Sequence, residues 1–212
     1  MKVVEIFNSI EGEGRRAGLP CTFIRLYGCN LNCSYCDSQY ACKDSGYDIL
    51  SISEILEIVK GYGTQAVTVT GGEPLIHPGV NNLLNALIHN GFYVNVETNG
   101  TIEPEIRDPK IFYTVDFKTN ASGMSDKMNP RIFENLHEMD VLKFVVGSRE
   151  DLNQALEVTE KYDIKSFIYV SPVFGAIEGK EIVEYIQAHQ LWNWRVQVQL
   201  HKIIFDPNAR GV

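Results

Sequence analysis

The sequence predicts an α/β fold with a mostly parallel sheet, built as one domain. Short β-branched runs alternate with amphipathic stretches along the chain, which is typical of strand–helix–strand units with right-handed crossovers. Glycines and polar residues gather where the predicted strands end, and the strand starts are plainer. The 212 residues can enclose one sizeable core, and no linker, repeat or low-complexity segment divides them.

The predicted elements follow in chain order. We expect strands at residues 3–7, 22–27, 66–70, 93–97, 112–116, 141–146, 167–170 and 195–200. We expect helices at residues 53–60, 80–89, 130–138, 150–161 and 180–189. Ser53 is the expected N-cap of the first helix, and Glu178 and Glu181 stand near the start of the last one.

Unusual residues follow most predicted strands. They are Asn8-Ser9, Gly28-Cys29, Gly71-Gly72-Glu73-Pro74, Thr98-Asn99-Gly100, Lys118, Ser171-Pro172 and His201-Lys202. In parallel α/β folds and barrels, sites form at the carboxyl ends of the strands. We therefore expect these segments to share one site.

Composition narrows the class of protein. Apolar residues make up 44% and charged residues 22%, as in ordinary soluble domains, and no apolar run approaches the ~20 residues of a membrane span. The net charge of −8, without a basic run, argues against nucleic acid as a partner. The residues after Met1 resemble a strand and not a signal-peptide core, so we expect a cytoplasmic protein with reduced cysteines.

The most specific motif is a run of three cysteines. Cys29, Cys33 and Cys36 have C-x3-C-x2-C spacing. Three clustered thiolates suit an iron–sulfur cluster that leaves one iron open. The alternative is a closed zinc site that takes Cys42 or a histidine as its fourth ligand. Cys21, on an alternating strand, is expected in the core, and Cys42 is expected to be a bystander.

A second motif, Thr70-Gly71-Gly72-Glu73-Pro74, closes the third predicted strand. Glycines there allow the backbone to approach a polar ligand such as an amino acid. A plain turn is the alternative for a Gly-Gly pair alone. The cysteine run upstream favours the ligand interpretation.

The two motifs together resemble the radical S-adenosylmethionine superfamily, in which Gly-Gly-Glu-Pro matches the methionine-binding segment. The resemblance implies a shortened, partial TIM-like barrel and a [4Fe–4S] cluster on three cysteines. It also implies that the open iron binds S-adenosylmethionine, whose reductive cleavage gives a 5′-deoxyadenosyl radical. The cofactors would supply this chemistry, and the protein would supply placement and exclusion of water.

The N-terminal segments 7–14, 23–31 and 36–38, with Pro20, are similar to those of the 7-carboxy-7-deazaguanine synthase family. The resemblance implies a ring contraction of 6-carboxy-5,6,7,8-tetrahydropterin with loss of ammonia, in the pathway to queuosine and other 7-deazapurines. That family uses a magnesium ion and forms homodimers, and flavodoxin is its expected electron donor.

Residue roles follow from the same resemblance. The implied substrate contacts are Ile10, Glu11, Gly12, Arg25, Thr70, His201 and the Val212 carboxylate. Arg25 would pair with the substrate carboxylate, and its alternative is a bridge to a neighbouring acid. Glu11 departs from the usual Gln and, as a carboxylate, cannot donate a hydrogen bond. Ser38 would bind magnesium or, alternatively, cap the turn after Cys36.

The implied contacts to S-adenosylmethionine come from five segments. They are Tyr35, Cys36, Asp37, Gly72, Glu97, Asn99, Asp116, Phe117, Lys118, Ser171 and Pro172. Two other functions remain possible from the sequence. One is a glycyl-radical activase of the same superfamily, which would act on a protein partner, and the other is a zinc-stabilised binding module.

Overall fold

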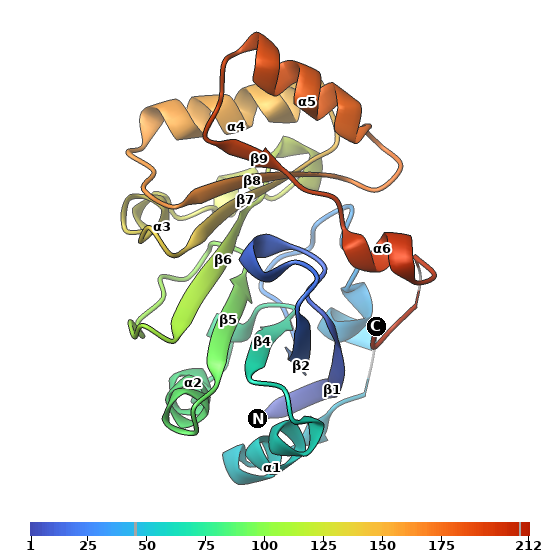
Figure 1. The fold of residues 1–212 in the computed structure, drawn as a ribbon, viewed down its shortest axis with the longest axis vertical. Coiled ribbons are helices and arrows are strands. Elements are labelled where there is room, and N and C mark those ends of the chain that lie inside the picture. Colours follow the sequence, from blue (N-terminus) through green and yellow to red (C-terminus); the bar gives the residue numbers. More distant parts are fainter. Residues whose placement is uncertain (45, 208) are drawn as a thin grey trace.

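The computed structural model describes residues 1–44, 46–207 and 209–212, and in them one sheet runs through the whole molecule (Figure 1). Its order is β3-β1-β2-β4-β5-β6-β7-β8-β9. The strands are β1 (Lys2–Ile10), β2 (Pro20–Leu26), β3 (Asp48–Ile49), β4 (Ala66–Gly71), β5 (Tyr93–Thr98), β6 (Ile111–Phe117), β7 (Val141–Val146), β8 (Phe167–Pro172) and β9 (Trp194–Val196). Neighbouring strands from β2 through β9 are parallel, whereas β1 pairs antiparallel with β2 and β3. The edges β3 and β9 do not pair, so the predicted partial barrel is confirmed.

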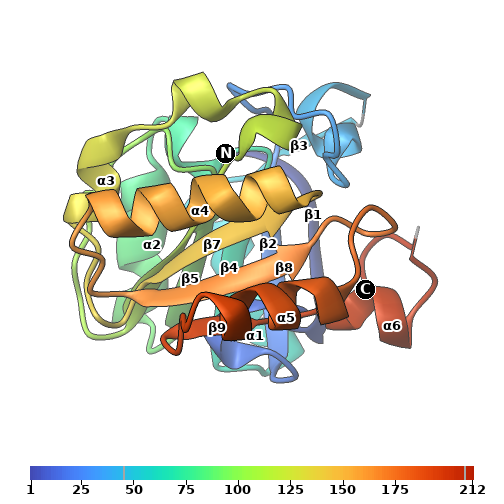
Figure 2. The same ribbon diagram turned by 90° about the horizontal axis from the view of Figure 1, so that it is seen from above.

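Helices cover the outer side of the sheet. They are α1 (Ile52–Tyr62), α2 (Val80–His89), α3 (Pro130–Glu134), α4 (Arg149–Lys161) and α5 (Gly179–Ala188), whereas α6 (Leu200–Ile204) lies apart from them, beside the loop that follows β1 (Figure 1). Helix α4 packs on β7, and α5 packs on β8 and β9 (Figure 2). Fully buried side chains such as Val69, Leu83 and Phe144 fill the space between the two layers, which is the hydrophobic core that holds the strands in place. None of the described helices is long and apolar enough to cross a membrane.

The first strand is longer than the sequence predicts. Its antiparallel pairing with β2 continues to Ile10, which lies opposite Pro20. Asn8 and Ser9 therefore lie inside a strand, and the expectation that they follow one at the common site is wrong. Because β1 runs antiparallel to β2, its carboxyl end lies at the end of the sheet where the parallel strands begin.

The chain after β9 also differs from the prediction of a strand over residues 195–200. β9 ends at Val196, and Leu200 begins α6 instead. The Gln197 side chain exchanges two hydrogen bonds with the Gly14 backbone, and the Leu200 amide donates to the Gly12 carbonyl. These contacts turn the chain out of the sheet and over the loop that follows β1.

Two helix boundaries depart from the sequence pattern. Ser51 rather than Ser53 caps α1, because the Ser51 hydroxyl and the Glu54 carboxylate form a reciprocal capping box. Helix α3 ends four residues before the predicted residue 138. There the His137 amide donates to the Asp140 carboxylate in a turn that leads into β7.

Candidate active site

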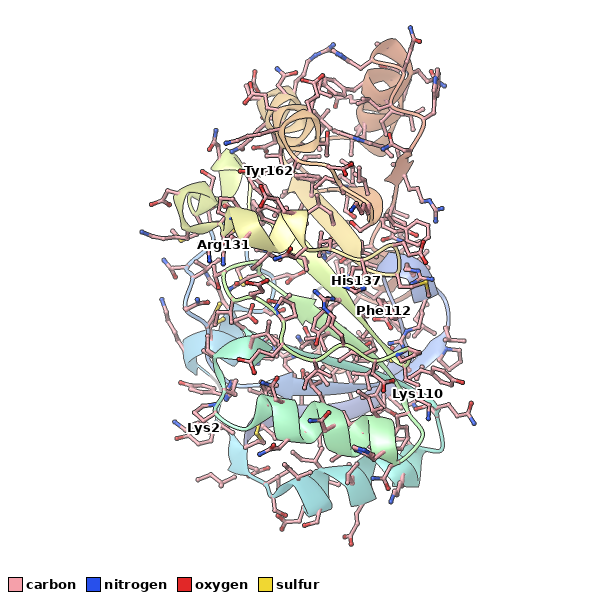
Figure 3. The ribbon with its side chains drawn as sticks, turned by 90° about the vertical axis from the view of Figure 1, so that its left-hand side faces the viewer. Lys2, Lys110, Phe112, Arg131, His137 and Tyr162 are labelled. Atoms are coloured by element: carbon pink, nitrogen blue, oxygen red, sulfur yellow. The ribbon has the colours of Figure 1, made fainter. Side chains whose placement is uncertain are left out.

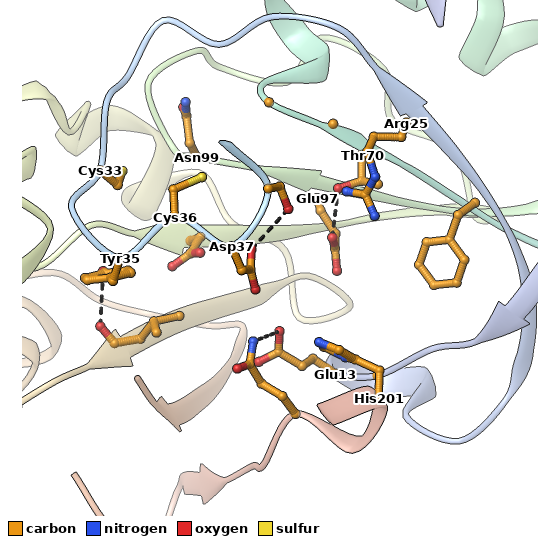
Figure 4. A pocket seen from close by; sticks show the side chains of 18 of the residues that line it. Glu13, Arg25, Cys33, Tyr35, Cys36, Asp37, Thr70, Glu97, Asn99 and His201 are labelled. Carbon is orange, nitrogen blue, oxygen red and sulfur yellow. Dashed lines mark hydrogen bonds between the residues drawn. The ribbon is translucent and has the colours of Figure 1, made fainter. Parts of the chain in front are cut away.

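A cavity of about 260 Å³ opens at the carboxyl ends of the parallel strands, between the cysteine loop and α6 (Figure 4). Most residues assigned from the sequence line it. They are Ile10, Gly12, Arg25, Cys29, Cys33, Tyr35, Cys36, Asp37, Ser38, Thr70, Gly72, Glu97, Asn99, Asp116, Lys118, His201 and Val212. Most of the segments expected at one site therefore line the same cavity, whereas Asn8-Ser9 and Ser171-Pro172 do not.

The three motif cysteines occupy one wall of this cavity. Hydrogen bonding from the Cys42 thiol lowers the pKa of Cys29 to about 6 and that of Cys36 to about 7, although burial acts in the opposite direction. The Leu31 amide also donates to the Cys29 sulfur, at 3.4 Å. Burial raises the pKa of Cys33. Three thiols on one short loop form a donor set that fits an iron–sulfur cluster with one open iron.

Cys42 lies in the π-helical turn Tyr40–Asp44 and is not the bystander that the sequence suggested. Its thiol contacts both Cys29 and Cys36, and it lines the same cavity. Cys42 lies six residues after Cys36, and the turn Tyr40–Asp44 brings the two thiols together. By contrast, Cys21 is buried, as expected.

The glycines of the second motif serve the cysteine loop. A side chain at Gly72 would collide with the Gly28 carbonyl and with Cys29. A side chain at Gly71, whose φ is +146°, would collide with the Leu26 backbone. The adjacent Glu73 is buried outside the cavity. Its carboxylate accepts hydrogen bonds from the Thr98 hydroxyl and from the backbone amides of Leu75 and Asn99. The motif thus joins β4 to the loop and to β5, while Gly72 also faces the cavity.

Asn99 extends this arrangement from the end of β5. Its amide donates to the Asn30 side chain at 2.9 Å and to the Cys29 sulfur at 3.6 Å. Glu73 holds the Asn99 backbone amide at 2.6 Å. The second motif therefore fixes an amide donor against a motif cysteine.

A chain of buried charges crosses the floor of the cavity. Lys118 donates to Asp116 at 2.6 Å, and Lys143 lies 3.8 Å from Asp116 and 3.3 Å from Glu13. Burial alone would lower the pKa values of both lysines, but these carboxylates raise them above the ordinary range. Burial likewise opposes ionisation of Glu13, but Lys143 holds its pKa below the ordinary value. One Glu13 oxygen and one Asp116 oxygen have no hydrogen-bond partner among the described residues. These atoms can bind a polar ligand.

Glu97 lies with the residues assigned to the substrate. It accepts from the Thr70 hydroxyl at 2.9 Å, and Figure 4 shows it between Arg25 and His201, away from Cys33 and Tyr35. Burial raises the pKa of Glu97, and Lys143 opposes this rise. Its position does not favour the expected contact with S-adenosylmethionine.

Arg25 forms the bridge that the sequence left as its alternative role. Its Nε donates to Glu5 at 2.7 Å across the antiparallel pair β1–β2. The same guanidinium also lines the cavity, beside Tyr40 and Phe7. Arg25 can therefore hold an anion through its remaining N–H groups while Glu5 orients it.

Ser38 and its neighbour Asp37 also line the cavity. The Ser38 hydroxyl donates to Asp37 at 3.0 Å, and Lys202 of α6 lies 3.3 Å from the other Asp37 oxygen. Burial would raise the pKa of Asp37, but Lys202 and Ser38 hold it below the ordinary value. Hydroxyl and carboxylate oxygens side by side are the hard ligands that Mg²⁺ prefers, so the donor set fits that ion.

His201 packs directly against Gly12. A side chain at Gly12 would strike the imidazole, so this glycine allows α6 to approach the loop after β1. Burial lowers the pKa of His201, which keeps the ring neutral near pH 7 and able both to donate and to accept. Gly211 and Val212 of the tail also line the cavity.

Four assigned residues do not line the cavity. The Glu11 carboxylate accepts from Arg16 at 2.8 Å and from Thr68, so its side chain is engaged at the amino-terminal end of the barrel and does not face the cavity. Phe117 packs against Phe133 and Phe144, because alternation along β6 turns Asp116 and Lys118 inward and Phe117 outward. The remaining two are Ser171, buried near Glu13, and Pro172.

Sequence reasoning missed several residues of the cavity wall. They are Glu13, Tyr40, Cys42, Lys143, Gln199 and Arg210. The sequence contains one indication for Lys143, because it is a charged residue inside an otherwise apolar predicted strand. Glu13 had none, because its role depends on Lys143, which is 130 residues away.

The fold, the cysteine wall and the open-ended barrel define a radical S-adenosylmethionine protein. The model of the "Radical SAM superfamily" matches residues 23–187, and the chain belongs to that superfamily. Within it, the chain belongs to the 7-carboxy-7-deazaguanine synthase family.

That closer assignment depends on full-length relatives. A protein of this name from Clostridium acetobutylicum is 42% identical, with 100% of this chain and 99% of the relative covered. Another, from Methanospirillum hungatei, is 39% identical, with 98% and 86% covered. The crystal structure of QueE from Escherichia coli superposes with a TM-score of 0.77, at 26% identity, and covers 93% of each chain.

Proposed function

We propose that the protein is a 7-carboxy-7-deazaguanine synthase, a carbon–nitrogen lyase that contracts the ring of 6-carboxy-5,6,7,8-tetrahydropterin with loss of ammonia. The observation that carries this proposal is one cavity with two different ends. Cys29, Cys33 and Cys36 line one end, and Arg25, Glu13 and Lys143 line the other. Full-length relatives of that name, up to 42% identical in the comparisons above, support it.

The thiol end suits the family's cofactors. Cys29, Cys33 and Cys36 would hold a [4Fe–4S] cluster, and Gly72, Asn99, Tyr35 and Asp37 would border S-adenosylmethionine at the open iron. Bound there, these cofactors supply one-electron chemistry that the side chains cannot provide. Asn99 donates toward the Cys29 sulfur, and such hydrogen bonds tune the potential of iron–sulfur sites.

The charged end suits a carboxylated pterin. Arg25 offers N–H donors to a carboxylate, and Glu13 and Glu97 offer carboxyl groups to an amino-pyrimidinone edge. Lys143 keeps Glu13 ionised, while neutral His201 can donate or accept opposite Glu97. The buried position of Glu13 and Lys143 would limit the access of water to the bound substrate.

Magnesium and the protein partners form part of the same proposal. Ser38, beside the Asp37 carboxylate, would bind Mg²⁺ and place it near the substrate carboxylate. Loss of activity on chelation, restored by added Mg²⁺, would support this site. We further propose a cytoplasmic homodimer that takes electrons from a donor such as flavodoxin. Sedimentation equilibrium and reduction assays test these two points separately.

The alternative functions fit the cavity less well. A glycyl-radical activase must admit a segment of a protein partner, whereas this cavity is small and lined with paired buried charges. A zinc-stabilised module would have no use for the charged end. Both alternatives predict no turnover of a pterin.

Product formation tests the proposal. The reconstituted protein is incubated anaerobically with reductant, S-adenosylmethionine, Mg²⁺ and the carboxypterin, and products are separated by mass. We expect 7-carboxy-7-deazaguanine and ammonia in equal amounts. Absence of both, with the cluster loaded and S-adenosylmethionine bound, would reject the assignment.

A further inference from the structure

The charged end of the cavity contains a second arginine, which the tail contributes. The guanidinium carbon of Arg210 lies 4.1 Å from the centroid of the Tyr40 ring, and that of Arg25 lies 5.7 Å from the same centroid. All three residues line the cavity. The fold thus brings two cations from opposite ends of the sequence to one tyrosine.

The charge of Arg25 is already compensated. Glu5 Oε1 accepts from Arg25 Nε at 2.7 Å and from the Tyr40 hydroxyl at 2.7 Å. Both members of this ion pair are more than three-quarters buried. An approaching carboxylate is attracted by Arg25 and repelled by Glu5, so Arg25 offers directed N–H groups but little net charge.

Arg210 differs in this respect. Within the described part of the chain, no ion pair involves Arg210, and its guanidinium lies over the face of the Tyr40 ring. An aromatic face attracts a cation without neutralising it. The lysines of the cavity wall have ion-pair partners, because Lys118, Lys143 and Lys202 each pair with a carboxylate. Among the described cations that line this end of the cavity, Arg210 is therefore the one without an ion-pair partner.

We propose that Arg210 is a specificity-determining residue, which binds the carboxylate of the substrate together with Arg25. The inference rests on the proposed function, because it takes the carboxylated pterin as the ligand. Arg25 orients the carboxylate, and Arg210 provides the net charge that favours an anion over a neutral analogue. The tail then closes on the substrate through this contact.

The first experiment compares variants of the reconstituted full chain. We expect Arg210→Ala to raise KM for the carboxypterin about 10- to 100-fold with little change in kcat, and Arg210→Lys to recover part of the loss. Arg149→Ala is the matched control, because that exposed arginine of α4 lies 5.6 Å from the centroid of another tyrosine ring, Tyr185. An unchanged KM in Arg210→Ala, or an equal rise in Arg149→Ala, would overturn the inference.

A second measurement separates charge recognition from a structural role of the tail. The carboxamide analogue of the substrate, which is neutral at that position, is titrated into each cluster-loaded protein. We expect the wild type to prefer carboxylate over carboxamide about tenfold or more and Arg210→Ala to lose most of that preference. Equal weakening of both ligands would show that Arg210 only holds the tail. If the wild type forms no product, the proposed function fails; if product forms with unaltered discrimination in Arg210→Ala, only the role of Arg210 fails.

Discussion

The two ends of the cavity are built in different ways. The thiol end comes from one short loop, in which Cys29, Cys33 and Cys36 lie within eight residues, supported by Gly72 and Asn99. The charged end is assembled from β1, β2, β7, α6 and the tail. A local motif therefore specifies cofactor chemistry, whereas substrate recognition depends on contacts between distant segments.

The largest expected effect is on bound iron, and it distinguishes the three cysteines that would hold the cluster from the neighbouring Cys42. Cys33→Ala should lose bound iron and all turnover, because a three-thiolate site has no spare ligand. Cys42→Ala should keep its iron, since that thiol is a hydrogen-bond partner of Cys29 and Cys36 and not one of the three motif ligands. Iron content and visible absorbance of anaerobic protein measure both, with Cys21→Ala as a buried control. Iron loss in Cys42→Ala alone would reverse this assignment.

A smaller effect is expected from the charged end alone. Arg25→Ala should raise KM for the carboxypterin about 10- to 100-fold and leave cluster content unchanged, because Arg25 lies at the charged end of the cavity, where we propose that it holds the substrate carboxylate. Steady-state kinetics and iron analysis of the same sample give both numbers. Loss of the cluster with normal substrate binding would contradict the separation of the two ends.

Glu11 and Glu13 sharpen the comparison, because they are two residues apart and both buried. Glu11→Gln should destabilise the fold by about 2–4 kcal/mol, since it leaves Arg16 without its buried partner, while KM stays near the wild-type value. Glu13→Gln should instead raise KM. Thermal unfolding and kinetics are measured on each variant. The two assignments fail if Glu11→Gln changes KM more than Glu13→Gln does.

The smallest effect concerns Glu73. Burial raises the pKa of its carboxyl group from 4.5 to about 7. Folded Glu73 keeps its proton to higher pH than unfolded Glu73, so its contribution to stability is lost as pH rises from about 4.5 to about 7. We expect a loss of about 1–3 kcal/mol over this window. Glu73→Gln cannot ionise and should show a flatter dependence. Unfolding midpoints at pH 5, 6, 7 and 8 measure the difference, and parallel curves would refute it.

The sequence predicts the thiol end far better than the charged end, for physical reasons. Spacing places three cysteines on one loop, and the carboxyl ends of parallel strands gather Thr70, Glu97 and Lys118 at one edge. The antiparallel direction of β1 has no such local signal, so Asn8 and Ser9 were misplaced. Phe117 follows the alternation of its strand into the core, which its neighbours Asp116 and Lys118 could have indicated.

The features of the site that the sequence does not predict depend on tertiary contacts. Glu11 is bound by Arg16, and α6 forms because Gln197 and Leu200 bond to the loop after β1. Tyr40 and Arg210 meet across 170 residues of chain, so no periodicity could pair them. A pattern of strand ends locates the cavity, but not the charges that line its far side. On another face, Lys110, Phe112 and His137, which Figure 3 labels, line a second cavity of about 980 Å³.

The most direct test is an anaerobic crystal structure with S-adenosylmethionine and the carboxypterin bound. We expect the methionine amino and carboxylate groups at the iron that Cys29, Cys33 and Cys36 leave open. We expect the pterin carboxylate about 3 Å from the guanidinium of Arg25, with Arg210 closing over it. A pterin bound outside this cavity, or with its carboxylate toward the cysteine loop, would contradict the account.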